Sequence, residues 1–378
     1  MRKHWIDNLR WVTVLLVLLY HVFYFYNNKG VFGGIGGFGD YPECRQYQDV
    51  VMYILYPFFM PLLFLLAGIS SRYALQKQSA REWFRARTRK LLVPGTIGLF
   101  VLQWMTGYFN TVVAGRGSEL AAVPGPGKYI MCALSGIGPL WFIQLLWLLC
   151  LMLLLVRALD RKDRFWNWCG KAGIFWIIML GVLLWAGEQT LIKNPRPESA
   201  DGLWNLYKPL FYIIPFLLGY FVFSHDEVQE KVKKAWIPLV VCAAAAGIAL
   251  IVTTFGQDNT SPQYLGSPLN CIYGWLACLA MMGWFNAKFD RTGRFAGYMT
   301  RSSYGIYIVH YLVIASLGYM MKVYTGLPPV AMYTILTVAV FSLSPLLYEL
   351  LRRIPFVRWA TLGIKQKCAQ KPDNQMAG

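Results

Sequence analysis

Charged residues are scarce in this sequence. Of its 378 residues, 14% are charged and 57% are hydrophobic, whereas a soluble domain carries about 25% charged residues. So little charge cannot coat the surface of a soluble enzyme with one large core. The apolar residues run in blocks near the roughly 20 residues that a membrane-spanning helix needs, not in the alternating segments of about 10 residues that build a membrane barrel. The sequence therefore predicts an all-α, polytopic membrane protein.

Metal-binding patterns are also missing. The 8 cysteines form no Cys-x-x-Cys pair and no cluster with histidine at metal spacing. Four of them lie inside apolar runs, where cysteine behaves as a small hydrophobic residue: Cys150, Cys242, Cys271 and Cys278. We therefore expect no metal and no resident cofactor. The formal charge of +18 does not predict nucleic-acid binding, because the basic residues lie in short loops between apolar blocks.

About ten apolar segments have the length of a transmembrane helix. We predict spans at about 11–28, 49–70, 91–113, 137–157, 173–192, 206–223, 235–255, 267–287, 302–321 and 329–351. The span at 206–223 is the shortest, and it contains two prolines. We expect one transmembrane domain over residues 1–364, followed by a polar, disordered tail at 365–378.

The loops between these spans differ in charge from one side to the other. One side holds 28 of the 36 Lys and Arg residues, and the other side holds 8. Because basic loops stay in the cytoplasm, we predict that the basic side is cytoplasmic and includes both termini. Its segments are 1–10, 72–90, 157–171, 224–234, 288–301 and 352–378.

Two histidines fall inside predicted spans, where ionisable groups are costly and tend to be functional. His21 lies eleven residues after Arg10, about 16 Å along a helix, and the two share a face. His310 lies nine residues after Arg301, about 14 Å along a helix that runs in the same direction. Tyr307 shares a face with His310. We predict that both imidazoles lie at one depth, where a histidine can act as a general base; the alternative is hydrogen bonding between packed helices.

The densest basic run precedes the third predicted span. It contains Arg85, Arg87, Arg89 and Lys90. Taken alone, the run is explained by membrane topology and contact with anionic lipid. The functional alternative is a phosphate clamp that joins Arg10 and binds a substrate from the cytoplasm.

Other polar signals have ordinary explanations. Gly34, Gly36 and Gly39 match the letters of a dinucleotide-binding motif, but no strand precedes them and no helix of a βαβ unit follows, so we predict a flexible outer loop. Gln103, Gln144 and Asn270 lie within spans, where hydrogen bonds between helices are the default.

Five motifs together resemble acyltransferase family three, bacterial membrane enzymes that O-acylate glycans. The first is Asp7-x-x-Arg10 with His21 further along the same span. The second, Phe64-Leu65-Leu66-Ala67-Gly68, has Ala67 where the family often has Ser. The third, Arg87-x-x-Lys90-x-x-x-Pro94, has Lys for the family's second Arg. Leu140-Trp141-Phe142 and the segment from Ser303 through Tyr304 and Tyr307 to His310 complete the set, in the family's order along nearly the whole chain.

The resemblance implies an acyl-CoA-dependent O-acyltransferase of the bacterial cytoplasmic membrane. An acetyl or succinyl group would pass from cytoplasmic acyl-CoA to a hydroxyl of a carbohydrate or lipid-linked glycan acceptor. It further implies catalytic roles for His21 and Arg10, with His310 and Tyr307 beside them. CoA phosphates would then meet Arg87, Lys90, Arg89 and Arg85. A proton-coupled transporter or exporter is the alternative, although we find no paired broken helices of the kind that many transporters show.

Overall fold

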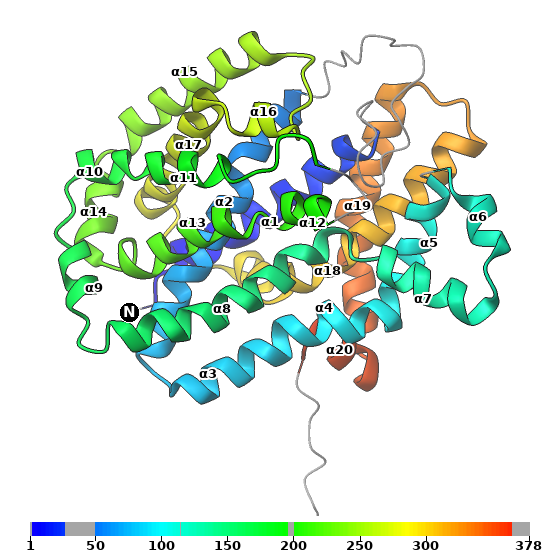
Figure 1. Ribbon diagram of the computed structural model, residues 1–378, viewed down its shortest axis with the longest axis horizontal. Coiled ribbons are helices and arrows are strands. Elements are labelled where there is room, and N and C mark those ends of the chain that lie inside the picture. Colours follow the sequence, from blue (N-terminus) through cyan, green and yellow to red (C-terminus); the bar gives the residue numbers. More distant parts are fainter. Residues whose placement is uncertain (1, 27–49, 114, 196–199, 365–378) are drawn as a thin grey trace, which may run out of the picture.

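The chain forms a bundle of helices in a computed structural model (Figure 1). The structure describes residues 2–26, 50–113, 115–195 and 200–364. Every regular element within these ranges is a helix, which confirms the all-α prediction. The glycine-rich segment at 34–39 and the tail at 365–378 lie outside the described residues.

Eight helices among the described residues are long and apolar enough to cross a membrane. Two are composite: Ala80–Val113, and Gly138–Leu159, which joins η4 (Gly138–Leu140) to α8 (Trp141–Leu159). The other six are α1 (His4–Phe25), α2 (Val50–Leu75), α15 (Trp236–Thr254), α17 (Pro268–Lys288), α18 (Arg294–Tyr324) and α19 (Pro329–Leu351).

The two remaining predicted spans are interrupted. The span at 206–223 falls on α12 (Ala200–Tyr207) and α13 (Pro209–Phe221), which meet α14 (Asp226–Lys234) at a bend of 105°. The span at 173–192 falls on α10 (Ile174–Met179) and α11 (Gly181–Glu188), together a shorter apolar helix. The described helices thus support eight spans, or nine with the bent pair, and the tenth stays a prediction.

The shorter helices lie between these spans or after the last one. They are α6 (Gly117–Ala122), α7 (Gly125–Ser135), α9 (Arg164–Cys169), α16 (Pro262–Leu265) and α20 (Pro355–Leu362).

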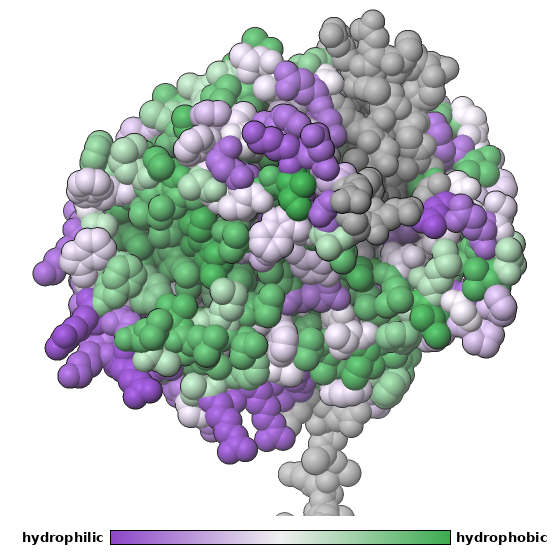
Figure 2. Space-filling model, in the orientation of Figure 1, coloured by the Kyte–Doolittle hydropathy of each residue, from purple (hydrophilic) through white to green (hydrophobic). Residues whose placement is uncertain are grey.

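Helix α2 lies at the centre of the bundle, and α15 and α19 lie at its edge. The interior buries 72% of the apolar window of α2 but only 22% and 28% of those of α15 and α19. Large apolar side chains such as Leu155, Val252 and Val338 are therefore exposed, and hydrophobic surface covers a broad part of the face in Figure 2. An apolar surface of this extent needs lipid, because water would not solvate it.

The glycine of the second motif is required by helix packing. A Cβ on Gly68 of α2 would lie 2.0 Å from the carbonyl oxygen of Phe216 in α13. A Cβ on Gly219 of α13 would likewise lie 2.1 Å from the carbonyl oxygen of Leu65. Paired glycines let two membrane helices approach closely, and here they bring α13 against the centre of the bundle.

The basic run before the third span is helical, which differs from the loop that the sequence analysis assigned to 72–90. Ser79 and Glu82 form a reciprocal capping box that starts α3 (Ala80–Arg87). The helix continues without a gap through η2 (Thr88–Leu92), α4 (Val93–Gly98), η3 (Leu99–Gln103) and α5 (Trp104–Val113). The run therefore presents its cations on different faces of a helix.

The predicted cytoplasmic segments meet at one end of the bundle. Lys3 donates hydrogen bonds of 2.5 Å to both Asp226 and Gln229, which joins segment 1–10 to α14. Asn8 donates to the carbonyl oxygens of Phe289 and Arg291, each at 2.7 Å. One end of the molecule therefore holds three of the predicted cytoplasmic segments.

Two further predicted cytoplasmic segments, 72–90 and 157–171, are joined by an ion pair at the same end. Arg72 is 5% exposed and donates hydrogen bonds of 2.8 and 3.0 Å to the carboxylate of Asp163. These bonds hold the pKa of the Asp163 carboxyl below its usual value. Predicted outer segments meet elsewhere: Gln263 donates to the carbonyl oxygen of Lys193 at 3.4 Å. The alternation of loops along the chain is thus consistent with the structure, while their assignment to the cytoplasm stays a prediction.

Reporter fusions test that assignment. We expect fusions after residue 80 and after residue 165 to report a cytoplasmic location, because both positions lie within predicted cytoplasmic segments. A fusion near residue 120 should report an external location. A cytoplasmic signal at residue 120 would contradict the orientation.

Candidate functional site

Two histidines from distant parts of the chain face each other inside the bundle. His21 on α1 and His310 on α18 bring their Nδ1 and Nε2 atoms, respectively, to 3.1 Å. His310 is fully buried, and His21 is partly buried. The contact confirms the prediction that both imidazoles lie at the same depth.

The partners of the ring nitrogens define the tautomers of the pair. His310 Nδ1 lies 2.5 Å from the carbonyl oxygen of Tyr307, and His21 Nδ1 lies 2.9 Å from that of Val17. A carbonyl oxygen only accepts, so each Nδ1 carries the hydrogen and each Nε2 of the neutral rings is a lone pair. His21 Nδ1–H then also donates to His310 Nε2. Within the described part of the chain His21 Nε2 has no hydrogen-bond partner, so its lone pair is available to a substrate.

Aromatic rings enclose the exposed side of His21. The rings of Tyr20 and Tyr311 each lie 5.4 Å from the imidazole, centroid to centroid, and that of Tyr24 lies 6.5 Å away. Tyr20 and Tyr24 flank His21 along α1, and Tyr311 follows His310. The sequence analysis did not single out these tyrosines, although their spacing from the two histidines could have identified them.

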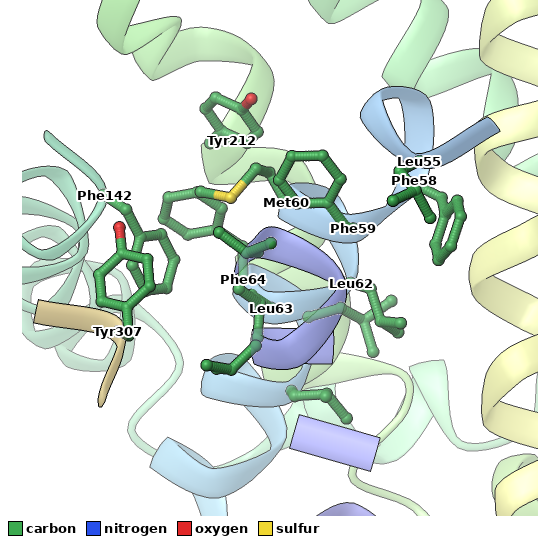
Figure 3. Close-up of a cluster of buried hydrophobic side chains, with 14 of the residues drawn as sticks. Leu55, Phe58, Phe59, Met60, Leu62, Leu63, Phe64, Phe142, Tyr212 and Tyr307 are labelled. Carbon is green, nitrogen blue, oxygen red and sulfur yellow. The ribbon is translucent and has the colours of Figure 1, made fainter. Parts of the chain in front are cut away.

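The motif at 140–142 contributes to the same region. Figure 3 shows Phe142 between Phe64 and Tyr307, with Tyr212 beyond Phe64. Ring centroids are 4.8 Å apart for Phe142 and Phe64 and 5.8 Å apart for Phe142 and Tyr307. Aromatic packing therefore connects the second motif, the Leu-Trp-Phe motif and α18.

The hydroxyl of Tyr307 is engaged by the protein itself. It donates to the carbonyl oxygen of Pro139, directly before the Leu-Trp-Phe motif. Its ring lies 5.6 Å from that of His310. Tyr307 thus joins α18 to the start of α8, and its hydroxyl hydrogen is not free for a substrate.

Tyr304 makes the corresponding contact one turn earlier. Lys90 lies in η2, a π-helical turn just before Pro94. The Tyr304 hydroxyl donates to the carbonyl oxygen of Lys90. The third motif is therefore joined to α18 through the backbone of Lys90.

A cluster of cations lies toward the basic end of α1. Arg10 donates hydrogen bonds to Asp7 at 3.1 Å and to Ser70 at 2.6 Å. Arg87 interacts electrostatically with both Arg10 and Lys90. Asp7 also pairs with Arg2 at 2.7 Å, so its single negative charge does not balance the cluster. Three like charges held together in this way suit an anion with several phosphates.

Arg85 and Arg89 lie apart from that cluster. Both line a groove of about 720 Å³ next to Phe84, Leu154 and Trp359. Two residues along a helix turn the side chain by about 200°, so Arg85 points away from Arg87. The structure therefore brings Arg10, Arg87 and Lys90 together and leaves Arg85 and Arg89 elsewhere.

A buried ion pair lies beyond the tyrosines that surround His21. Lys208 Nζ is 3.6 Å from Glu188 Oε1, and each side chain is 4% exposed. Lys208 also lies 5.3 Å from the ring of Tyr56, which stacks on Tyr20 at 5.5 Å. Lys208 falls at the start of the predicted span at 206–223, and no local pattern indicates that it pairs with Glu188 in the interior.

Two of the polar residues predicted to join helices do so. Gln103 donates to the carbonyl oxygen of Ile308 at 2.9 Å, and Gln144 donates to that of Gly95 at 2.6 Å. Asn270 instead donates to the nearby carbonyl oxygen of Leu265 at 3.1 Å. Among the described residues, no group of three His, Cys, Asp or Glu side chains could hold a metal ion.

Comparison with known proteins supports the resemblance read from the motifs. A family model described as an acyltransferase domain matches residues 3–349, nearly the whole chain. Neither the curated proteins nor the solved structures gave a match. The matched range contains both histidines, the cation cluster and every motif that meets at α18, and it shows that the chain belongs to the acyltransferase 3 family of membrane O-acyltransferases.

Proposed function

We propose that this protein transfers an acetyl or succinyl group from acyl-CoA to a hydroxyl of a cell-envelope glycan. The acceptor is a carbohydrate or a lipid-linked glycan, and the membrane is the bacterial cytoplasmic membrane. The observation that carries the proposal is the Nε2 of His21, which has no partner among the described residues and is held in place by the bond from Nδ1 to His310. Such an atom is what the acylation of a hydroxyl requires as a base.

The reaction follows from the tautomers. His21 Nε2 removes the proton from the acceptor hydroxyl while its oxygen attacks the thioester carbonyl carbon. The new C–O bond forms, the C–S bond breaks, and the proton on Nε2 passes to the departing CoA thiolate. While His21 is protonated, its Nδ1–H bond to His310 stabilises the imidazolium, because a charged donor makes a stronger bond than a neutral one.

The cation cluster explains how the acyl-CoA donor is bound. Phosphates of CoA cannot enter the bilayer, whereas the acyl thioester must reach His21. Arg10 and His21 lie on the same helix, about 16 Å apart along its axis, so one end of α1 binds the phosphates and the other performs the chemistry. The predicted cytoplasmic location of Arg10 places the donor inside the cell and the acceptor at or beyond the outer face.

His310 and Tyr307 are positioning residues in this scheme. His310 accepts from His21 and so fixes the orientation of the base. Tyr307 supplies the carbonyl oxygen that sets the tautomer of His310, and its hydroxyl holds α18 to Pro139. We do not expect either side chain to exchange a proton with the substrate.

The activity is measured with purified full-length protein, acetyl-CoA or succinyl-CoA, and candidate glycans. We expect release of free CoA that depends on both the donor and the acceptor. A transporter would instead release no CoA with any acceptor and would move a solute across a vesicle in response to a proton gradient. That result would overturn the proposed reaction.

His21→Ala should abolish most of the transfer. Loss of a general base lowers rates by roughly 10²–10⁴-fold, while acyl-CoA binding and the melting temperature should stay near those of the wild type. His310→Gln, which keeps an acceptor near the position of Nε2, should retain more turnover than His310→Ala. Turnover and melting temperature are measured in the same preparation.

His225 supplies the matched control. Its ring stacks on Trp166 at 3.9 Å, and its Nε2 lies 2.8 Å from the carbonyl oxygen of Trp166, within the predicted cytoplasmic segments. His225→Ala should lower stability and activity together, as a structural histidine does. If His21→Ala behaves in the same way, His21 is not the base.

Arg87→Ala should weaken acyl-CoA binding. A charge-assisted hydrogen bond contributes about 1.5–3 kcal/mol, which corresponds to a loss of affinity of roughly 10- to 150-fold. Arg85→Ala should cause a smaller loss, because Arg85 lies on the other face of the helix. Calorimetric titration with acyl-CoA measures both, with Lys234→Ala as a control for a cation on α14. Equal losses at positions 85 and 87 would restore the larger clamp predicted from the sequence.

A further inference from the structure

The groove beside α3 has three arginines along one edge. Arg81, Arg85 and Arg89 follow at intervals of four residues, so they project from one side of the helix. The remaining lining is mainly apolar and comes from three parts of the chain, with Phe84 on α3, Leu154 on α8 and Trp359 on α20. The groove holds about 720 Å³, and it combines a cationic edge with an apolar floor.

The part of the chain that the structure describes does not neutralise the cationic edge. Within the described ranges, no acidic side chain forms an ion pair with any of the three arginines. Arg89 is partly buried, and its Nε has no hydrogen-bond partner. A buried guanidinium nitrogen without a partner is costly, so the groove favours an occupant that brings negative charge.

The apolar floor restricts what that occupant is. Phe84 and Trp359 are large side chains, and Leu154 lies on a helix whose neighbouring Leu155 is 66% exposed toward the lipid side. A free inorganic anion would contact the arginines but would leave this floor uncovered. A molecule with an anionic head and an acyl chain would contact both.

We propose that the groove binds an anionic phospholipid. Its phosphate accepts hydrogen bonds from the guanidinium groups of Arg81, Arg85 and Arg89, and one acyl chain covers Phe84, Leu154 and Trp359. The site is distinct from the cluster of Arg10, Arg87 and Lys90. Arg87 and Lys90 lie on another face of the helix that carries the groove arginines, and Arg10 lies on α1.

A lipid bound to one face of this helix would then stabilise the phosphate-binding residues on its other face. α3 continues through η2 into α4, so a lipid bound along Arg81 and Arg85 holds in place the segment that carries Arg87 and Lys90. α20 closes the groove from the other side through Trp359. The lipid fills the gap that α3, α8 and α20 leave between them.

Native mass spectrometry of the purified full-length protein tests the proposal. Phosphatidylglycerol should remain bound at energies that remove phosphatidylcholine. The double variant Arg81→Ala, Arg85→Ala should retain phosphatidylglycerol roughly 10- to 30-fold less well, because each basic residue near the headgroups adds a similar share of the attraction. The matched double variant Lys234→Ala, Arg291→Ala removes two exposed cations outside the groove and should retain it as the wild type does.

Fluorescence gives an independent test of location. Brominated phosphatidylglycerol, titrated into phosphatidylcholine nanodiscs, should quench the emission of Trp359. The signal is the difference between the wild type and Trp359→Phe, and it should saturate at low mole fraction. The arginine double variant should shift saturation to higher mole fractions.

Three results would overturn the site. One is equal retention of phosphatidylcholine and phosphatidylglycerol, and another is unchanged retention in the arginine double variant. The third is displacement of phosphatidylglycerol from Trp359 by acetyl-CoA, which would make the groove part of a donor site. None of these outcomes depends on the proposed transfer reaction, since every readout is lipid binding.

Discussion

The hydrogen bond between His21 and His310 is the constraint on which the site depends. It joins α1 to α18 inside the bundle at a distance of 3.1 Å. With the hydrogen on His21 Nδ1, the bond requires a lone pair at His310 Nε2, and the carbonyl oxygen of Tyr307 favours this by accepting the hydrogen bond from His310 Nδ1. The remaining nitrogen, His21 Nε2, is consequently the one left for a substrate. The identity of the base therefore follows from a chain of donors and acceptors that begins in the backbone of α18.

Helix α18 connects the family motifs because its polar residues repeat every three positions. Tyr304 bonds the carbonyl oxygen of Lys90, Tyr307 bonds that of Pro139, and His310 meets His21. Successive contacts are about 4.5 Å apart along the axis, so the helix reaches from the basic run to the histidine pair. Lys90 lies in the π-helical turn η2, so the first of these contacts ties an irregular part of the third span to α18.

The sequence was sufficient for features that depend on local pattern. Apolar run length located eight of the spans, and counting residues along two helices placed His21 and His310 at one depth. Local sequence pattern was not sufficient where a tertiary contact determines the location of a side chain. Lys208 lies at the start of a predicted span, and nothing in the local sequence shows that it forms a buried ion pair with Glu188. From the sequence, the basic run could form a single phosphate-binding site. A capping box starts a helix there, and the helix places the basic side chains on two different faces.

That division has a physical reason. Arg10, Arg87 and Lys90 repel one another, and a bundle can hold them together only if their ligand supplies the missing negative charge or if water reaches them. Adding Arg85 and Arg89 to the same cluster would increase the repulsion without adding a counterion. Placing them on another side of the continuous helix removes that cost and, in the proposed lipid site, directs them to an anionic phosphate. A helix with basic residues on two faces can therefore bind a soluble polyphosphate on one side and the membrane on the other, and each contact restrains the helix for the other.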